Sequence, residues 1–225
     1  MPVSRAKRTQ LSHTVSEKLS RAIIAGEFRP GTKISEPTLS AMLGVSRAPI
    51  REALIELEVR GLVEFDPAGR TRVPVLTPRD VEEIYTVRLM IDPVAASLAA
   101  QRAKADTFAA LEGIITATKA AKTLADISRL DTEFHGRIVV AADNRRLQAC
   151  WNVLRDQVAL WLAQMQLRHQ PVVRLAKKLT VESHQRLLDA IRSGDARRAA
   201  EEARTHVTAW IRMMPELPAS EPAKS

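Results

Sequence analysis

Cysteine, aromatic residues and long apolar runs are all scarce in this sequence. The single cysteine, Cys150, excludes a disulfide within the chain and favours a reducing compartment, so we expect a cytoplasmic protein. Aromatic residues make up 4% of the 225 residues, which favours helices over sheets. No apolar run reaches the roughly 18–20 residues that a membrane span needs. The basic N-terminus has no apolar stretch behind it, so neither a secretory signal nor a membrane partner is expected.

Basic residues are plentiful and unevenly placed. The net charge is +8 and the pI is about 10.1. Residues 1–35 alone hold seven Lys or Arg and only two acids. An excess of this kind favours a polyanionic partner near the start of the chain.

The first third of the chain has the element order of a winged helix-turn-helix. Residues 1–10 are expected to be a flexible basic arm, and 11–76 a DNA-binding domain. The expected elements are helices at 11–26, 36–43 and 46–60, and a β-hairpin at 62–65 and 71–75. In such a unit the second helix of the helix-turn-helix enters the DNA major groove by its N-terminal residues.

The rest of the chain shows only helical periodicity. Residues 77–80 are expected to be a linker that starts a helix, and 81–214 an antiparallel bundle of six or seven helices. The Pro- and Ser-rich residues 215–225 are expected to be a disordered tail. The predicted fold is therefore mostly α, with a small β-hairpin in its N-terminal domain.

The stretch GVSRAPIREAL places two arginines at the start of the groove-reading helix. Arg47 and Arg51 are one turn apart, so both project from one face. The planar guanidinium suits guanine O6 and N7 or a phosphate. Arg70 and Arg72, at the hairpin tip, suit the sugar-phosphate backbone or a minor groove. The alternative is a solvated basic helix that binds nothing.

The longer run ISEPTLSAMLGVSRAPIREALIELEVRGLVEF resembles the N-terminal DNA-binding domain of GntR-family bacterial transcription regulators. By that resemblance Arg47 and Arg51 are the leading contacts with a double-stranded operator. The residues expected to help them are Ser46, Ala48 and Pro49. Pro37 replaces a basic residue found in other members, so no contact is assigned to it. The tip AGRTR also departs from the usual Asn-Arg-Gly order.

One acid and three histidines lie on apolar stripes of the C-terminal region. Asp131 and His135 are four residues apart on one helical face. His184 lies ten residues before the turn at 193–195 and His206 eleven residues after it, so both stand roughly 15–16 Å from the bend. Three imidazoles and a carboxylate that meet inside a bundle suit a divalent ion such as Zn²⁺. The alternative is that each histidine is a hydrogen-bonded core residue.

Three segments of this region resemble the FCD-type effector domain of one large GntR subfamily. They are YTVRLMIDPVAASLAA, DTEFHGRIV and ESHQRLLDAIRSGDARRAAEEARTHV. The resemblance implies that Asp131, His135, His184 and His206 hold a divalent metal at the base of an effector pocket. Zinc is the first expectation, with nickel and manganese as alternatives.

Arg88 lies on the predicted buried face of its helix and needs an anion. One interpretation is an internal ion pair with Asp92, which stands where the family commonly has Glu. The other is that Arg88 receives the carboxylate of a small effector whose other end touches the metal, and the resemblance favours this interpretation.

These patterns predict a homodimeric transcription regulator whose affinity for a palindromic operator is controlled by a small carboxylic acid. An enzyme is not expected. The alternative functions are a metal-dependent enzyme acting on a small organic acid and a metal-free structural bundle. The sequence shows no obvious general base for the first alternative.

Overall fold

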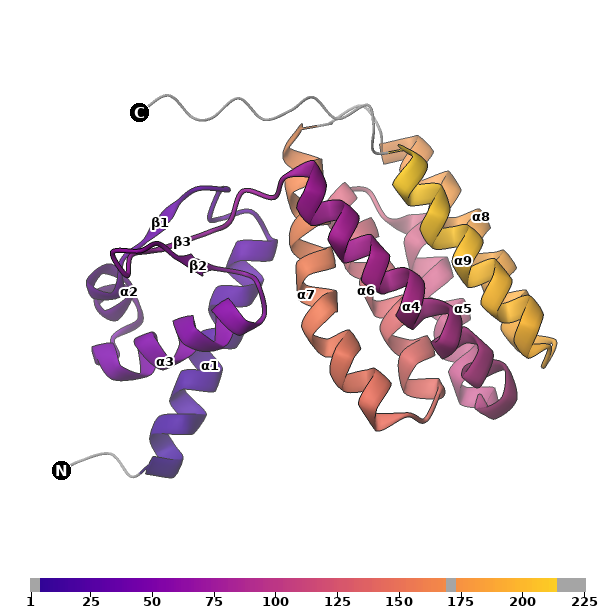
Figure 1. Cartoon of the computed structure of the whole chain (residues 1–225), viewed down its shortest axis with the longest axis horizontal. Coiled ribbons are helices and arrows are strands. Elements are labelled where there is room, and N and C mark those ends of the chain that lie inside the picture. Colours follow the sequence, from indigo (N-terminus) through magenta and orange to yellow (C-terminus); the bar gives the residue numbers. More distant parts are fainter. Residues whose placement is uncertain (1–4, 169–172, 214–225) are drawn as a thin grey trace. The chain divides into compact units, whose positions relative to one another are not determined.

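The computed structural model describes residues 5–168 and 173–213, and it divides the chain into two compact units (Figure 1). The first unit is Met1–Val75 and the second is Leu76–Ser225. No helix within the described residues is long and apolar enough to cross a membrane.

The first unit is a winged helix-turn-helix, as predicted. Its helices are α1 (Arg5–Ile24), α2 (Glu36–Leu43) and α3 (Arg47–Val59). Its strands are β1 (Lys33–Ile34), β2 (Glu64–Phe65) and β3 (Thr71–Arg72), which form an antiparallel sheet in the order β1-β3-β2. The hairpin was predicted, but β1 was not, because two residues are too few to show alternation.

Residues 5–10 were predicted to be a flexible arm, and this was wrong. They form the first turns of α1, which continues without a break into the buried stripe of Val15, Leu19 and Ile23. The stretch contains no Pro or Gly that would end a helix, so a basic composition alone does not unfold it. Residues 1–4 lie outside the described part of the chain.

The turn between α2 and α3 is built by its capping residues. Ser35 caps α2 by accepting a hydrogen bond from the Thr38 amide. Gly44 ends α2 with φ of 67°, a left-handed conformation that favours glycine, and its N–H donates to the Ser40 carbonyl. One side of α3 is completely buried and carries Ile50, Leu54 and Leu57. The opposite side of α3 is left at the surface.

The second unit contains helices only, within its described residues. They are α4 (Pro78–Arg102), α5 (Ala105–Ala120), α6 (Leu124–Ala141), α7 (Arg145–Arg168), α8 (Val173–Arg192) and α9 (Ala196–Met213). Helix α4 lies along α9, and α6 packs against α4, α5, α7 and α8 (Figure 1). The prediction of six or seven helices is confirmed.

The predicted linker at 77–80 is the capped first turn of α4. The Thr77 hydroxyl accepts from the Asp80 amide, and the Asp80 carboxylate accepts from the Thr77 amide. The chain therefore becomes helical within three residues of Val75. The predicted tail at 215–225 lies outside the described residues.

Candidate metal and DNA-binding sites

Three helices bring the acid and the three histidines together. Asp131 and His135 come from α6, His184 from α8 and His206 from α9. None of the four is more than 5% exposed. The antiparallel turn between α8 and α9 sets His184 and His206 at one depth, as their spacing predicted.

The four side chains converge through one atom each. His135 Nε2 lies 2.9 Å from His206 Nε2, and His184 Nε2 lies 3.1 Å from Asp131 Oδ1. Oδ1 is also 3.9 Å from His135 Nε2 and 4.0 Å from His206 Nε2. The four atoms all lie within 4.8 Å of one another. Ligands placed about 2.0–2.2 Å from a common zinc ion would be separated by similar distances, so the cluster fits such an ion.

The outer ring nitrogens of two histidines have partners that orient the rings. His206 Nδ1 lies 3.0 Å from the Ser183 hydroxyl, and His135 Nδ1 lies 3.3 Å from Asp92 Oδ2. His184 Nδ1 is buried without a partner, while its ring stacks on Phe134 at 3.9 Å. For His135 and His206, a proton on Nδ1 leaves the Nε2 lone pair directed toward the shared centre, which is the tautomer that metal ligation needs.

Burial favours the neutral form of His135 and His206, while neighbouring groups keep Asp131 charged. Desolvation lowers the pKa of His135 and of His206 well below the usual value, and the Arg88 charge lowers that of His135 further. Burial alone would raise the pKa of Asp131, but a hydrogen bond from His184 and nearby positive charge hold it well below its usual range. Neutral imidazoles and a carboxylate are the protonation states that bind a metal.

Arg88 is buried beside this cluster and already has an anion. Its Nε and Nη2 donate to Asp92 Oδ2 at 3.1 and 2.9 Å. Its side chain is 1% exposed and lies 5.3 Å from the centre of the Tyr85 ring. Burial alone would lower the pKa of Arg88, yet the carboxylate of Asp92 raises it. The internal ion pair that the sequence left open is therefore present.

The residues predicted to read the groove lie at the start of α3. Ser46, Arg47, Ala48 and Arg51 are all exposed, and the two arginines are one helical turn apart. Pro49 is buried, so its side chain packs inward, and its expected contact with DNA stays a prediction. It shapes the first turn of the helix, where a missing N–H costs nothing.

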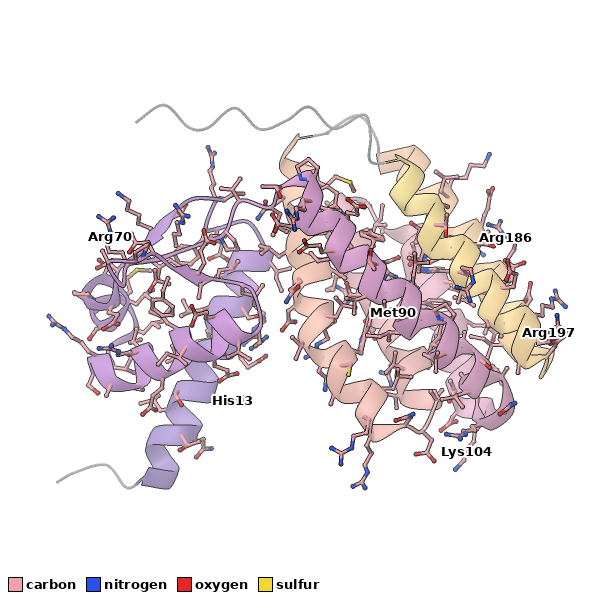
Figure 2. All side chains as sticks on the ribbon, viewed as in Figure 1. His13, Arg70, Met90, Lys104, Arg186 and Arg197 are labelled. Atoms are coloured by element: carbon pink, nitrogen blue, oxygen red, sulfur yellow. The ribbon has the colours of Figure 1, made fainter. Side chains whose placement is uncertain are left out.

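The two arginines of the wing are exposed but paired. Arg70 lies at the hairpin tip (Figure 2), where its Nε is 2.7 Å from Asp66 Oδ2. The Nε of Arg72 is 2.6 Å from Glu64 Oε1 across the hairpin. Asp66 and Glu64 lie four and eight residues from their arginines along the chain, and neither pairing was predicted from the sequence.

Ser183 is a further residue that the sequence analysis missed. It directly precedes His184 on α8, but its partner His206 belongs to α9. Only the packing of the two helices brings these atoms together, so no sequence signal could have found the contact.

A winged helix-turn-helix joined to a helical bundle with a buried ligand cluster defines a two-domain transcription regulator. Residues 11–73 match the family of bacterial regulatory proteins, gntR family, and residues 83–209 match the FCD domain. The chain belongs to the GntR family and carries an FCD domain, and it is a transcriptional regulator by that membership.

Curated relatives agree with this membership, and a solved structure shares the fold. The probable D-xylose utilization operon transcriptional repressor of Paenarthrobacter nicotinovorans is 30% identical over 213 residues, which span 92% of this chain and 90% of the relative. The uncharacterized HTH-type transcriptional regulator YdhC of Bacillus subtilis (strain 168) is 33% identical over 145 residues, 63% of this chain and 65% of the relative. The E. coli McbR/YncC structure shares the fold, with a TM-score of 0.76, 20% identity and coverage of 90% of this chain and 96% of that one. The relatives are named as transcriptional regulators and not as enzymes.

Proposed function

We propose that this regulator senses a small carboxylic acid through a divalent metal ion, and that the acid changes its affinity for a palindromic operator. The observation that carries the proposal is the convergence of four buried ligand atoms from three helices. Zinc is the ion expected first, because three imidazoles and one carboxylate suit a borderline divalent metal, and nickel and manganese remain alternatives.

The residues proposed to hold the ion are Asp131, His135, His184 and His206. A bound divalent ion would supply positive charge and open coordination positions for a carboxylate. Arg88 is proposed to hold the same acid, because its fixed charge is buried within the electrostatic reach of Asp131. The acid must therefore share the guanidinium with Asp92 or displace that carboxylate from it.

The surface of α3 is proposed to bind the operator. Arg47 and Arg51 would contact base edges or phosphates, with Ser46 and Ala48 beside them. Arg70 and Arg72 would contact the sugar-phosphate backbone of the DNA, after giving up part of their pairing with Asp66 and Glu64. A homodimer would present two such surfaces to a two-fold operator, and the cytoplasm is the proposed location.

The direction of control is proposed to be repression. The similarity to a probable operon repressor over 92% of this chain supports that direction. Acid binding would then weaken operator binding, because the two sites are coupled through a shared conformational equilibrium.

Elemental analysis of the purified full-length protein tests the metal. We expect close to one equivalent of a divalent metal per chain in the wild type, and a near-complete loss in His184→Ala. His13→Ala is the matched control, since it removes an exposed histidine from the other unit and should leave the metal content unchanged. Equal metal contents in all three proteins would refute the assignment.

A thermal-shift screen of small carboxylic acids with the metal-loaded protein tests the effector class. An acid that raises the melting temperature of the wild type should have no such effect on Arg88→Ala. The same acid should change operator affinity in the wild type only. A normal response of Arg88→Ala would remove this arginine from the site.

A further inference from the structure

One carboxylate oxygen connects the ligand cluster to the buried arginine. Asp92 Oδ2 accepts from Arg88 Nε and Nη2 at 3.1 and 2.9 Å, and His135 Nδ1 lies 3.3 Å from the same oxygen. Asp92 is 3% exposed, and its other oxygen, Oδ1, has no hydrogen-bond partner. The contact spans two helices, because Asp92 and Arg88 lie on α4 and His135 lies on α6.

The contact with His135 fixes the state of the imidazole. A carboxylate at Nδ1 retains the proton there and turns the Nε2 lone pair toward Asp131 and His206. A negative charge at this position also makes Nε2 a stronger donor to a metal.

The contact with Arg88 fixes the direction of the guanidinium. Asp92, one turn further along the same helix, accepts hydrogen bonds from Nε and Nη2 of Arg88. Because the guanidinium is planar, these two bonds fix the orientation of the whole group. Without this acceptor the arginine would be a buried charge with no hydrogen-bonded anion, and it would be free to turn or to take up water.

We infer that Asp92 is a positioning residue shared by the metal site and the carboxylate site, so that this one side chain sets the affinity of both. The inference rests on the proposed function. Ser183 provides the contrast within the same cluster, because its hydroxyl lies 3.0 Å from His206 Nδ1 and has no arginine partner within the described part of the chain. Loss of the Ser183 hydroxyl should weaken metal binding alone. Loss of the Asp92 charge should weaken both metal binding and acid binding.

The experiment uses the full chain, with Co²⁺ as the metal and acetate as the carboxylate. Co²⁺ affinity is measured by competition with a chromophoric chelator in wild type, Asp92→Asn and Ser183→Ala. Both variants should bind Co²⁺ about 10–100-fold more weakly, the usual effect of removing an outer partner of a metal-bound histidine. At saturating Co²⁺, acetate should change the visible spectrum of wild type and Ser183→Ala, and the change should be absent or strongly weakened in Asp92→Asn.

Comparing Co²⁺ affinity with the spectral response to acetate distinguishes a shared role of Asp92 from a general loss of structure. Asp92→Asn keeps the shape of the side chain, and the double variant Arg88→Gln with Asp92→Asn replaces the buried ion pair by two amides. Both should melt cooperatively without metal and both should show the Co²⁺ deficit.

Three results would overturn the inference. Unchanged Co²⁺ affinity in Asp92→Asn would remove its role at the metal, and a normal acetate response in that variant would remove its role at the arginine. A wild type that binds Co²⁺ but does not respond to acetate would also end the shared role. A wild type that binds no Co²⁺ would instead refute the proposed function on which the inference depends.

Discussion

The two units of this chain place their charged side chains in opposite ways. In the first unit Arg47 and Arg51 stand exposed on a helix whose other side is core. In the second unit Asp131 and the histidines around it are buried among packed helices. An exposed arginine can meet a large rigid polyanion, whereas a buried cluster can admit only an ion or a small molecule. The difference supports the proposal that the first unit binds DNA and the second unit binds the small ligand.

Each unit also has a group of histidine and acid side chains, and only one of them fits a metal. His13, Glu17 and Glu56 of the first unit have ligand atoms within the same 4.8 Å limit (His13 is labelled in Figure 2). Arg60 lies among them, with its Nη1 3.0 Å from Glu17 Oε1 and 3.5 Å from Glu56 Oε1, and so supplies the positive charge. Among the described residues, only histidines lie within ion-pair distance of Asp131. Composition alone does not make a metal site, because a neighbouring guanidinium can take the place of the ion.

Metal removal should give the largest effect, a fall in melting temperature that is confined to the helical unit. A ligand present at about 1,000 times its Kd stabilises the folded state by about 4 kcal/mol, which corresponds to roughly 8–16 °C for a chain of this size. We expect chelation to lower the melting temperature of the helical unit by about that amount. Calorimetry with and without chelator measures it. His184→Ala is the control that should show no chelator effect, and an equal shift in that variant would contradict the site.

Acid should destabilise the metal-free helical unit. The pKa of folded His135 and His206 lies well below 6.5, so below about pH 6.5 the unfolded chain takes up protons that the folded chain does not. Stability is therefore retained above that pH and lost as the pH falls, by about 1.4 kcal/mol per pH unit for each histidine. Urea unfolding of the chelated protein between pH 7 and pH 5 measures the slope. His206→Gln should reduce the slope by about half, and a slope unchanged by that substitution would show that the acid sensitivity has another origin.

Arg47→Ala should affect the first unit only. Loss of one bidentate base contact costs about 1–3 kcal/mol, or roughly 5–150-fold in operator affinity. Titration of the operator at fixed salt measures the loss, while metal content and helicity should remain those of the wild type. Arg79→Ala, which removes an exposed arginine from α4, is the matched control. Equal affinity of Arg47→Ala and wild type would refute the assignment of α3 to the groove.

Arg72→Ala should have the smallest effect. The exposed pair with Glu64 is worth about 0.2–1 kcal/mol, and the arginine must give up part of this pairing to bind a phosphate. We expect less than about a fivefold loss of operator affinity. The slope of log affinity against log salt concentration should become shallower by about one, because one phosphate contact is lost. A loss as large as that of Arg47→Ala would mean that the wing reads bases as well.

The sequence predicted the elements whose signals are local or periodic. Gly44 and Ser35 marked the turn before α3, and the spacing of His184 and His206 about a single bend placed them at one depth. These signals are physical, because capping and helical rise do not depend on the rest of the fold.

The remaining features depend on packing between elements. Strand β1 exists because Lys33 and Ile34 pair with Arg72 and Thr71 of β3, which lie 39 and 37 residues further along the chain. The contact of Ser183 with His206 likewise requires the packing of α8 against α9. Residues 5–10 were misjudged because a basic composition was given more weight than the helical stretch that follows them.

Helix α4 carries Arg88, and its cap at Thr77 stands two residues after the DNA-binding unit ends at Val75. Eleven residues separate Arg88 from Thr77, a helical distance of about 16 Å. A helix segment of that length moves as a rigid body. A small molecule that shifts the Arg88 guanidinium would therefore also displace the N-terminal end of α4. Under the proposed function, a displacement of this end of α4 would be how acid binding is signalled beyond the helical unit.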